Sequence, residues 1–74
     1  MERAFKDRYR MLGLNIAFFR KKRGYSQEKL AELVDISRTH MSRIETAECA
    51  VSLDIVFRLA DVLSVDAAKL FEER

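Results

Sequence analysis

The sequence predicts an all-α fold, a compact five-helix bundle formed by one small domain. The chain has 74 residues, no proline and only two glycines, Gly13 and Gly24, and its commonest residues are strong helix formers. Apolar residues recur at spacings of three and four, the period of a helix that buries one face. A chain of this length buries only about 60% of its unfolded surface, so we expect a bundle that presents a surface rather than a walled catalytic cleft.

The first predicted helix is the longest, and it carries one apolar stripe along its length. That stripe consists of Phe5, Tyr9, Leu12, Ile16 and Phe19. Residues 20–23 are four consecutive cations, which suit the last turn of a helix because its C-terminus carries a partial negative charge. Gly24 follows at the position where a left-handed residue usually ends a helix.

Two short helices should follow, each with a serine as its N-cap. Ser26 precedes the second helix, whose buried positions are Leu30, Ala31 and Val34, and Asp35 ends it. Ser37 precedes a third helix over residues 38–45, in which Met41 and Ile44 should point inward. Only residues 35–37 separate the two helices, and so short a connection forces them to cross steeply, as in a helix-turn-helix.

Ser52 is the predicted cap of a fourth helix. Its core stripe should contain Leu53, Val56, Leu59, Ala60 and Leu63. Asp66 should open a short fifth helix that ends near Leu70 and Phe71.

The third helix has a polar face that could meet DNA. At about 100° per residue, Thr39, Ser42 and Arg43 lie opposite Met41 and Ile44. Two further side chains flank this face, Arg38 and His40. Arginine can donate two hydrogen bonds to guanine, and the threonine methyl can pack on a thymine methyl. A solvated surface helix would carry similar residues, so the face alone leaves both readings open.

Charge is divided unevenly along the chain. Residues 1–44 contain eleven Lys or Arg and five Asp or Glu, whereas residues 45–74 contain three and seven. The first part is therefore suited to a polyanion and the second is not.

Residues 27–45, QEKLAELVDISRTHMSRIE, resemble the helix-turn-helix of the Cro and phage-repressor type, the xenobiotic-response-element (XRE) family. The matching residues are Gln27, Leu30, Ala31, Ile36, Ser37, Met41, Ile44 and Glu45. The resemblance covers about residues 12–71, with residues 1–11 as an N-terminal extension of the first helix. It implies a single lambda-repressor-like DNA-binding domain over residues 1–74.

The resemblance also implies roles for individual residues. Arg38, Thr39 and Arg43 would read bases, and Arg20 and Glu45 would form a buried ion pair. Phosphate contacts would come from Gln27, Ser26, Ser37, Ser42, Thr46 and Lys22. The sequence departs from the family at Asp35, where glycine is usual, at Val51, where proline is usual, and at Thr46-Ala47, which puts the backbone contact expected there in doubt.

These features predict a bacterial transcriptional regulator, a repressor or an activator, that binds a palindromic operator as a homodimer. Within this class the sequence is similar to controller proteins of restriction–modification systems, and a Cro-like repressor or a free-standing regulator fits as well. An antitoxin-type interaction module that binds its own promoter is the alternative. An enzyme is not expected, because no Gly-rich phosphate loop, Ser-His-Asp set or paired carboxylates occur.

Two apolar patches outside the predicted core are candidates for the dimer contact. Met11, Leu14 and Phe18 lie roughly 140° from the core stripe of the first helix, and Ile55 and Val62 form an off-core pair on the fourth. The fourth and fifth helices are the favoured side, because the acidic part of the chain should face away from DNA.

We expect no metal, cofactor or small-molecule effector. His40 and Cys49, nine residues apart, do not make a zinc site. His40 is interpreted as a residue flanking the groove, and Cys49 as a thiol without chemistry, a redox sensor being the alternative. The sequence lacks a signal peptide and the roughly 18-residue apolar run of a membrane span, so a cytoplasmic, nucleoid-associated protein is expected.

Overall fold

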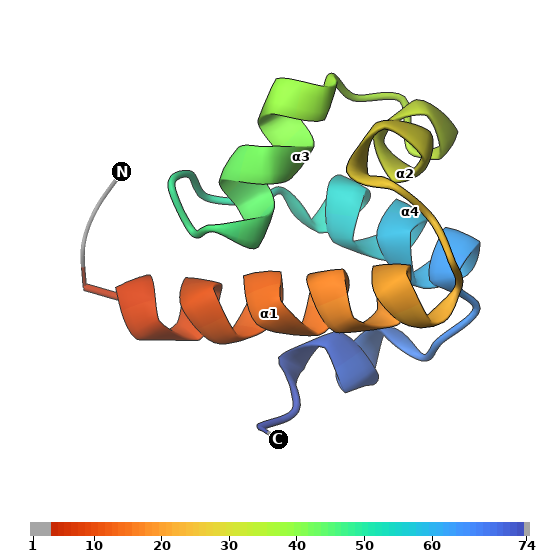
Figure 1. Cartoon of the computed structure of the whole chain (residues 1–74). Helices are drawn as coiled ribbons and strands as arrows, with labels where there is room; N and C mark the ends of the chain where they lie inside the picture. The colour runs from red at the N-terminus through yellow and green to blue at the C-terminus, as the bar shows by residue number, and fades with distance from the viewer. Residues whose placement is uncertain (1–3, 74) are drawn as a thin grey trace.

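The computed structural model describes residues 4–73, which form four α-helices and one 3₁₀ helix (Figure 1). The elements in chain order are α1 (Lys6–Lys22), α2 (Gln27–Leu33), α3 (Arg38–Glu45), α4 (Leu53–Leu63) and η1 (Ala67–Phe71). The long α1 crosses the molecule, with α2, α3 and α4 on one side and η1 on the other. Within the described range there is no strand, and no helix is long and apolar enough to cross a bilayer.

The predicted bundle of five helices is observed as four α-helices, and the short fifth helix expected after Asp66 is a 3₁₀ helix of five residues. Its N-cap, Asp66, makes no capping hydrogen bond through its side chain. An α-helix this short has few hydrogen bonds with which to offset the cost of nucleation. Short segments of this kind commonly adopt the tighter 3₁₀ form.

Serine side chains fix the first residues of α2, α3 and α4, as the sequence predicts. The hydroxyl oxygens of Ser26, Ser37 and Ser52 accept hydrogen bonds from the backbone N–H three residues further on, at 3.0, 3.0 and 3.2 Å. Each such cap is worth about 1 kcal/mol. The predicted bounds of the third helix, residues 38–45, agree with those of α3.

Left-handed residues end several of the helices. Gly24, after α1, has φ of 78°, and Asp35, after α2, has φ of 62°. Asp35 therefore adopts the conformation for which glycine is usual, which a short polar side chain tolerates best among non-glycine residues. The N–H of Ile36 then donates to the carbonyl of Ala31 at 2.9 Å, and the chain turns directly into α3.

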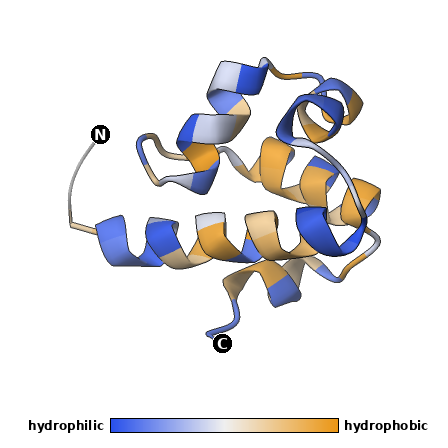
Figure 2. Ribbon diagram, in the orientation of Figure 1, coloured by the Kyte–Doolittle hydropathy of each residue, from blue (hydrophilic) through white to orange (hydrophobic). Residues whose placement is uncertain are grey.

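The core lies between α1 and the α2–α4 layer and continues to η1, and Figure 2 shows apolar residues on the facing sides of the helices. Its buried members are Leu12, Ile16, Leu30, Ala31, Val34, Met41, Ile44, Val56, Leu59, Ala60, Leu63 and Leu70. Two predicted core positions are wrong: Phe5 is 53% exposed and Leu53 is 62% exposed. Both lie at the start of a helix, where side chains tilt back past its N-terminal end and away from the packed turns.

Asn15 is a buried polar residue that the hydrophobic pattern does not reveal. Its Nδ2 donates to the carbonyl oxygens of Leu70 at 2.9 Å and Glu72 at 2.7 Å. The amide thereby attaches the last described residues to the middle of α1.

Candidate nucleic-acid interface

The position of α3 depends on two close contacts with the rest of the bundle. On one side, Ala31 of α2 is buried and the partly buried Ile36 packs on the core below the turn. On the other side, α1 approaches α3 at Gly13, where an added Cβ would lie 2.7 Å from the carbonyl oxygen of Ile44 and 2.5 Å from that of Glu45. Such distances exclude any side chain, so glycine allows the two backbones to meet.

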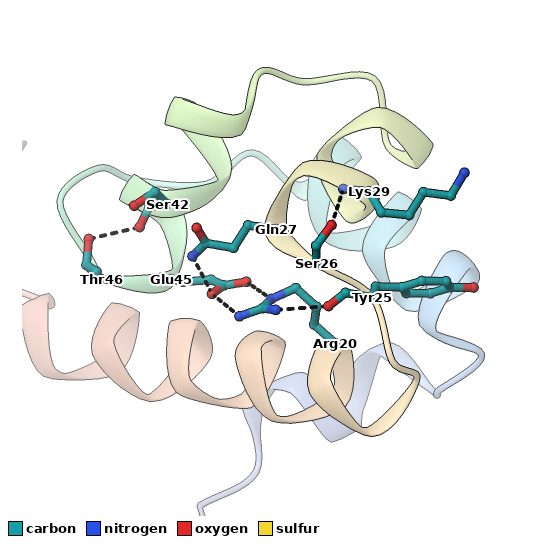
Figure 3. Close-up of polar contacts among 8 residues, drawn as sticks. All are labelled: Arg20, Tyr25, Ser26, Gln27, Lys29, Ser42, Glu45 and Thr46. Carbon is teal, nitrogen blue, oxygen red and sulfur yellow. Dashed lines mark hydrogen bonds and ion pairs between the residues drawn. The ribbon is translucent and has the colours of Figure 1, made fainter.

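A buried polar cluster joins the first three helices (Figure 3). Arg20 of α1 donates from Nε to Oε2 of Glu45 in α3 at 2.7 Å, and from Nη2 to Oε1 at 3.1 Å. A further bond runs from Nη1 to the carbonyl of Tyr25 at 3.0 Å. The side chains of Arg20 and Glu45 are only 11% and 6% exposed. This is the ion pair that the family resemblance implies.

Gln27, the first residue of α2, completes this cluster. Its Nε2 donates to Oε1 of Glu45 at 2.9 Å. The sequence analysis assigned Gln27 to phosphate binding only and did not predict this bond. The spacing of residues along α2 and α3 does not reveal it, because the bond depends on how the two helices cross.

The outward face of α3 is placed as the helical periodicity predicts. Arg38, Thr39 and Arg43 are exposed, Ser42 is half-buried, and Met41 and Ile44 are buried on the opposite side. An open hollow, the α3 hollow, is lined by Gln27, Arg38, Thr39, Ser42, Arg43 and Glu48. The structure thus brings Gln27 together with all three candidate base-reading residues.

Thr46 is engaged by a carboxylate that the sequence analysis missed. Its Oγ1 donates to Oε2 of Glu48 at 2.6 Å and lies 2.9 Å from the carbonyl oxygen of Ser42. The backbone N–H of Glu48 donates to the carbonyl of Arg43 at 2.8 Å. Ala47, between Thr46 and Glu48 in the sequence, is left-handed, with φ of 60°. The carboxylate of Glu48 therefore places a negative charge at the rim of the α3 hollow. It lies next to Thr46-Ala47, where the sequence differs from the family pattern.

Four of the candidate phosphate-binding residues do not line the α3 hollow, and one of them, Thr46, contacts it only through its bond to Glu48. Ser26 and Ser37 are exposed at the starts of α2 and α3, where each hydroxyl oxygen accepts its capping bond. Lys22 is nine residues after Gly13, which places it half a turn round α1 from the side that meets α3. Its ammonium nitrogen lies 5.9 Å from the centre of the Phe18 ring.

The two candidate dimer patches differ in exposure. On α1, Leu14 and Phe18 are 59% and 40% exposed, and Met11 is half-buried. On α4, Ile55 and Val62 are partly buried against the core of their own chain. Three other apolar side chains of α4 and η1 are more exposed than this pair: Leu53 (62%), Phe57 (54%) and Phe71 (47%). We call these three residues the α4–η1 patch.

A groove beside this patch is lined by side chains from both ends of the chain. Phe5, Tyr9 and Met11 contribute from the N-terminal side, and Val51, Leu53 and Phe71 from the C-terminal side.

His40 and Cys49 are both half-buried, and within residues 4–73 no group of three or more His, Cys, Asp or Glu is placed to hold a metal.

Comparison with known proteins identifies the family of this chain. The family model described as helix-turn-helix matches residues 16–70, from the second half of α1 to Leu70 in η1. The chain belongs to the helix-turn-helix family. Its relatives are XRE-type DNA-binding transcriptional regulators, controller proteins among them, which confirms the resemblance found in residues 27–45.

Among the relatives of this helix-turn-helix chain is the control protein C.SmaI of Serratia marcescens, 33% identical over 66 residues that cover 89% of this chain and 79% of that protein. Other curated relatives are longer. The chain spans 19% of an HTH-type transcriptional regulatory protein of Pyrococcus furiosus, to which it is 35% identical over 60 residues. It spans 61% of a hypothetical transcription factor of Neisseria meningitidis, at 32% identity.

Solved structures show the same helix-turn-helix fold. The restriction–modification controller protein C.AhdI of Aeromonas hydrophila superposes with a TM-score of 0.82 at 30% identity, over 85% of this chain and 96% of that one. The N-terminal DNA-binding domain of SinR from Bacillus subtilis superposes with a TM-score of 0.80 at 30% identity, over 88% and 96% of the two chains.

Replacing Gly13 with alanine should strongly destabilise the protein. The new Cβ would meet backbone carbonyls, which cannot move aside as a flexible side chain could, so α1 and α3 must separate. We expect the free energy of unfolding to fall by about 1–3 kcal/mol, measured by urea denaturation. Leu14→Ala is the matched control on the exposed side of the same helix and should change it by less than about 0.5 kcal/mol. Equal stability of the two variants would contradict the proposed close approach.

Proposed function

We propose that this chain is a sequence-specific regulator that binds double-stranded DNA with α3 in the major groove. The observation that carries this proposal is the outward face of α3, where Arg38, Thr39 and Arg43 are exposed on a helix whose opposite side is fully packed. A rigid helix that presents arginine and threonine can read base edges, because both side chains reach groups that differ between base pairs.

Contacts to phosphates would hold α3 in register. Gln27, Ser42 and Thr46 lie beside the base-reading residues, while Ser26 and Ser37 lie at the starts of the two helices. The hydroxyl or amide groups of Gln27 and the three serines can donate to phosphate oxygens, which positions a protein without reading sequence. Thr46 can do so only after its hydroxyl leaves Glu48. Lys22 points away from α3, so it would not contact a phosphate beside the groove. Its charge would instead add to the long-range attraction between DNA and the basic residues 1–44.

The proposal further includes a homodimer on a palindromic operator. Two copies could place their α3 helices in successive major grooves, about 34 Å apart. We assign the dimer contact to the α4–η1 patch, since Leu53, Phe57 and Phe71 expose apolar side chains that their own chain does not cover. Asp54 and Asp61 are exposed within about one turn of Phe57 on α4, and their negative charge also favours a side that faces away from DNA. Ile55 and Val62, which pack on their own core, are less suited to a partner.

Similarity to the control protein C.SmaI and to the controller protein C.AhdI supports the controller class of restriction–modification systems as the biological setting. An antitoxin that docks a second protein is the second candidate. The exposed Leu14 and Phe18 on α1 favour it, because they form an apolar stripe outside both the core and the α4–η1 patch. Copurification of a distinct small protein, lost on Leu14→Glu, would distinguish the antitoxin from the controller.

Alanine substitutions should separate base reading from phosphate binding. Arg38→Ala and Arg43→Ala should each cost roughly 1–3 kcal/mol on the selected site and relax the choice at one base position. Gln27→Ala should weaken binding to all sequences alike, because phosphates are the same everywhere. Selection of random duplexes against the purified protein and the variants would measure both effects and return the half-site and spacing. Intact binding by all three variants would contradict the assigned roles.

Removing the charge of Glu48 should strengthen DNA binding. A carboxylate at the rim of the α3 hollow repels phosphates, and like charges brought together at an interface oppose association. We expect Glu48→Gln to raise the affinity for duplex DNA severalfold at low salt, with a smaller gain at high salt because the repulsion is screened. Fluorescence anisotropy at two salt concentrations measures this, with Glu32→Gln, on the exposed side of α2, as the control for a simple change of net charge.

Placing a charge in the α4–η1 patch should dissociate the dimer. Leu53 is 62% exposed in the single chain, so Leu53→Glu should leave the fold intact while placing a buried charge in the dimer contact. Sedimentation velocity should show a shift toward monomer at concentrations where the unaltered protein is dimeric. Leu14→Glu, at a residue 59% exposed on α1, is the matched control. Dissociation by Leu14→Glu but not by Leu53→Glu would move the dimer contact to α1.

A further inference from the structure

The two carboxylate oxygens of Glu45 accept three hydrogen bonds in the buried cluster. Oε2 accepts from Arg20 Nε, and Oε1 accepts from both Arg20 Nη2 and Gln27 Nε2. The ion pair with Arg20 ties α1 to α3 and accounts for the burial of the carboxylate. It does not account for the bond to Gln27, which involves a side chain that is only half-buried and lines the α3 hollow.

We propose that Glu45 is a positioning residue that holds the carboxamide of Gln27 in one orientation for contact with DNA. A carboxylate can only accept hydrogen bonds, so the amide must turn its nitrogen, not its oxygen, toward Glu45. Figure 3 shows this arrangement, with the amide oxygen of Gln27 directed away from Glu45. Because the guanidinium of Arg20 clamps the carboxylate at 2.7 and 3.1 Å, the acceptor itself cannot turn.

This orientation fixes what Gln27 offers to a ligand. The amide group is planar and Nε2 carries two hydrogens, of which one is donated to Glu45. The direction of the second N–H is thereby set, and so is that of the amide oxygen. A free glutamine side chain loses much rotamer freedom when it is ordered, and a group ordered before association does not lose that freedom on binding. Glu45 therefore strengthens the DNA contact of Gln27 without touching DNA itself. This inference rests on the proposed DNA-binding function.

The composition of the chain makes the orientation directly observable. Gln27 is its only glutamine and Asn15 its only asparagine, so a ¹⁵N–¹H spectrum contains just two side-chain amide pairs. In the unaltered protein we expect the two Gln27 protons to be well separated, with slowed exchange of one of them. A Gln27 pair at the position of a freely rotating glutamine would overturn the proposal, and this measurement needs no variant to fold.

The matched variant removes both members of the ion pair together, Arg20→Met and Glu45→Met. Removing one partner would leave a buried charge uncompensated, whereas an apolar replacement of the whole pair is often tolerated. In this variant the Gln27 pair should move to the free position. The Asn15 pair should stay in place, because its acceptors are the carbonyls of Leu70 and Glu72, and its unchanged resonances also show that the bundle is folded.

A double-mutant comparison then measures the effect on binding. The probe is a fluorescent DNA duplex of mixed sequence at low ionic strength. Gln27→Ala should weaken binding by the unaltered protein by roughly two- to tenfold and have little effect in the Arg20→Met/Glu45→Met background. The same fold loss in both backgrounds would show that Glu45 only ties helices together, and would overturn the proposal. Absence of binding by the unaltered protein would instead overturn the DNA-binding function, while the amide spectrum would still report the orientation of Gln27.

Discussion

The arrangement of this bundle depends on one buried carboxylate. Glu45 is 9% exposed as a residue, and a charge in that position is tolerated only if donors surround it, because an uncompensated buried ion costs several kcal/mol. The donors come from α1 and α2, while the carboxylate is on α3. A change in the angle between any two of these helices would leave the carboxylate short of a donor. Close contact of α1 with the end of α3 at Gly13 acts in the same place, so α3 is held by charge and by shape together.

Local signals in the sequence were enough to predict most of the fold. The three capping serines, the bounds of α3 and most core positions follow from rules that involve neighbours within one or two turns. The predictions that differ from the structure concern residues at the ends of helices, where the rule based on neighbouring residues no longer applies. Leu53 continues the apolar period of α4 but precedes its first packed turn. The last element is helical, as predicted, but it is so short that it takes the 3₁₀ form, which the apolar spacing does not reveal.

The candidate site was predicted less completely, for a physical reason. Periodicity places Thr39 and Arg43 on the outer side of α3, and the family resemblance supplies the pair of Arg20 with Glu45. The bond from Gln27 to Glu45 joins residues 18 apart in the sequence and exists only because α2 and α3 cross at a particular angle. Glu48 reaches the α3 hollow by way of a left-handed Ala47, a conformation that an alanine does not signal. Such contacts are set by tertiary geometry.

The attachment of the C-terminal segment by Asn15 has a consequence for how the molecule opens. One carboxamide in the middle of α1 holds two backbone carbonyls, one in η1 and one just beyond it. Detaching that segment breaks both bonds at once and exposes a buried amide to water. Such coupling favours local opening in a single cooperative step rather than by gradual fraying from the last residue. We therefore expect the amides of η1 and of the residues just after it to exchange together, although 55 positions separate Asn15 from Leu70.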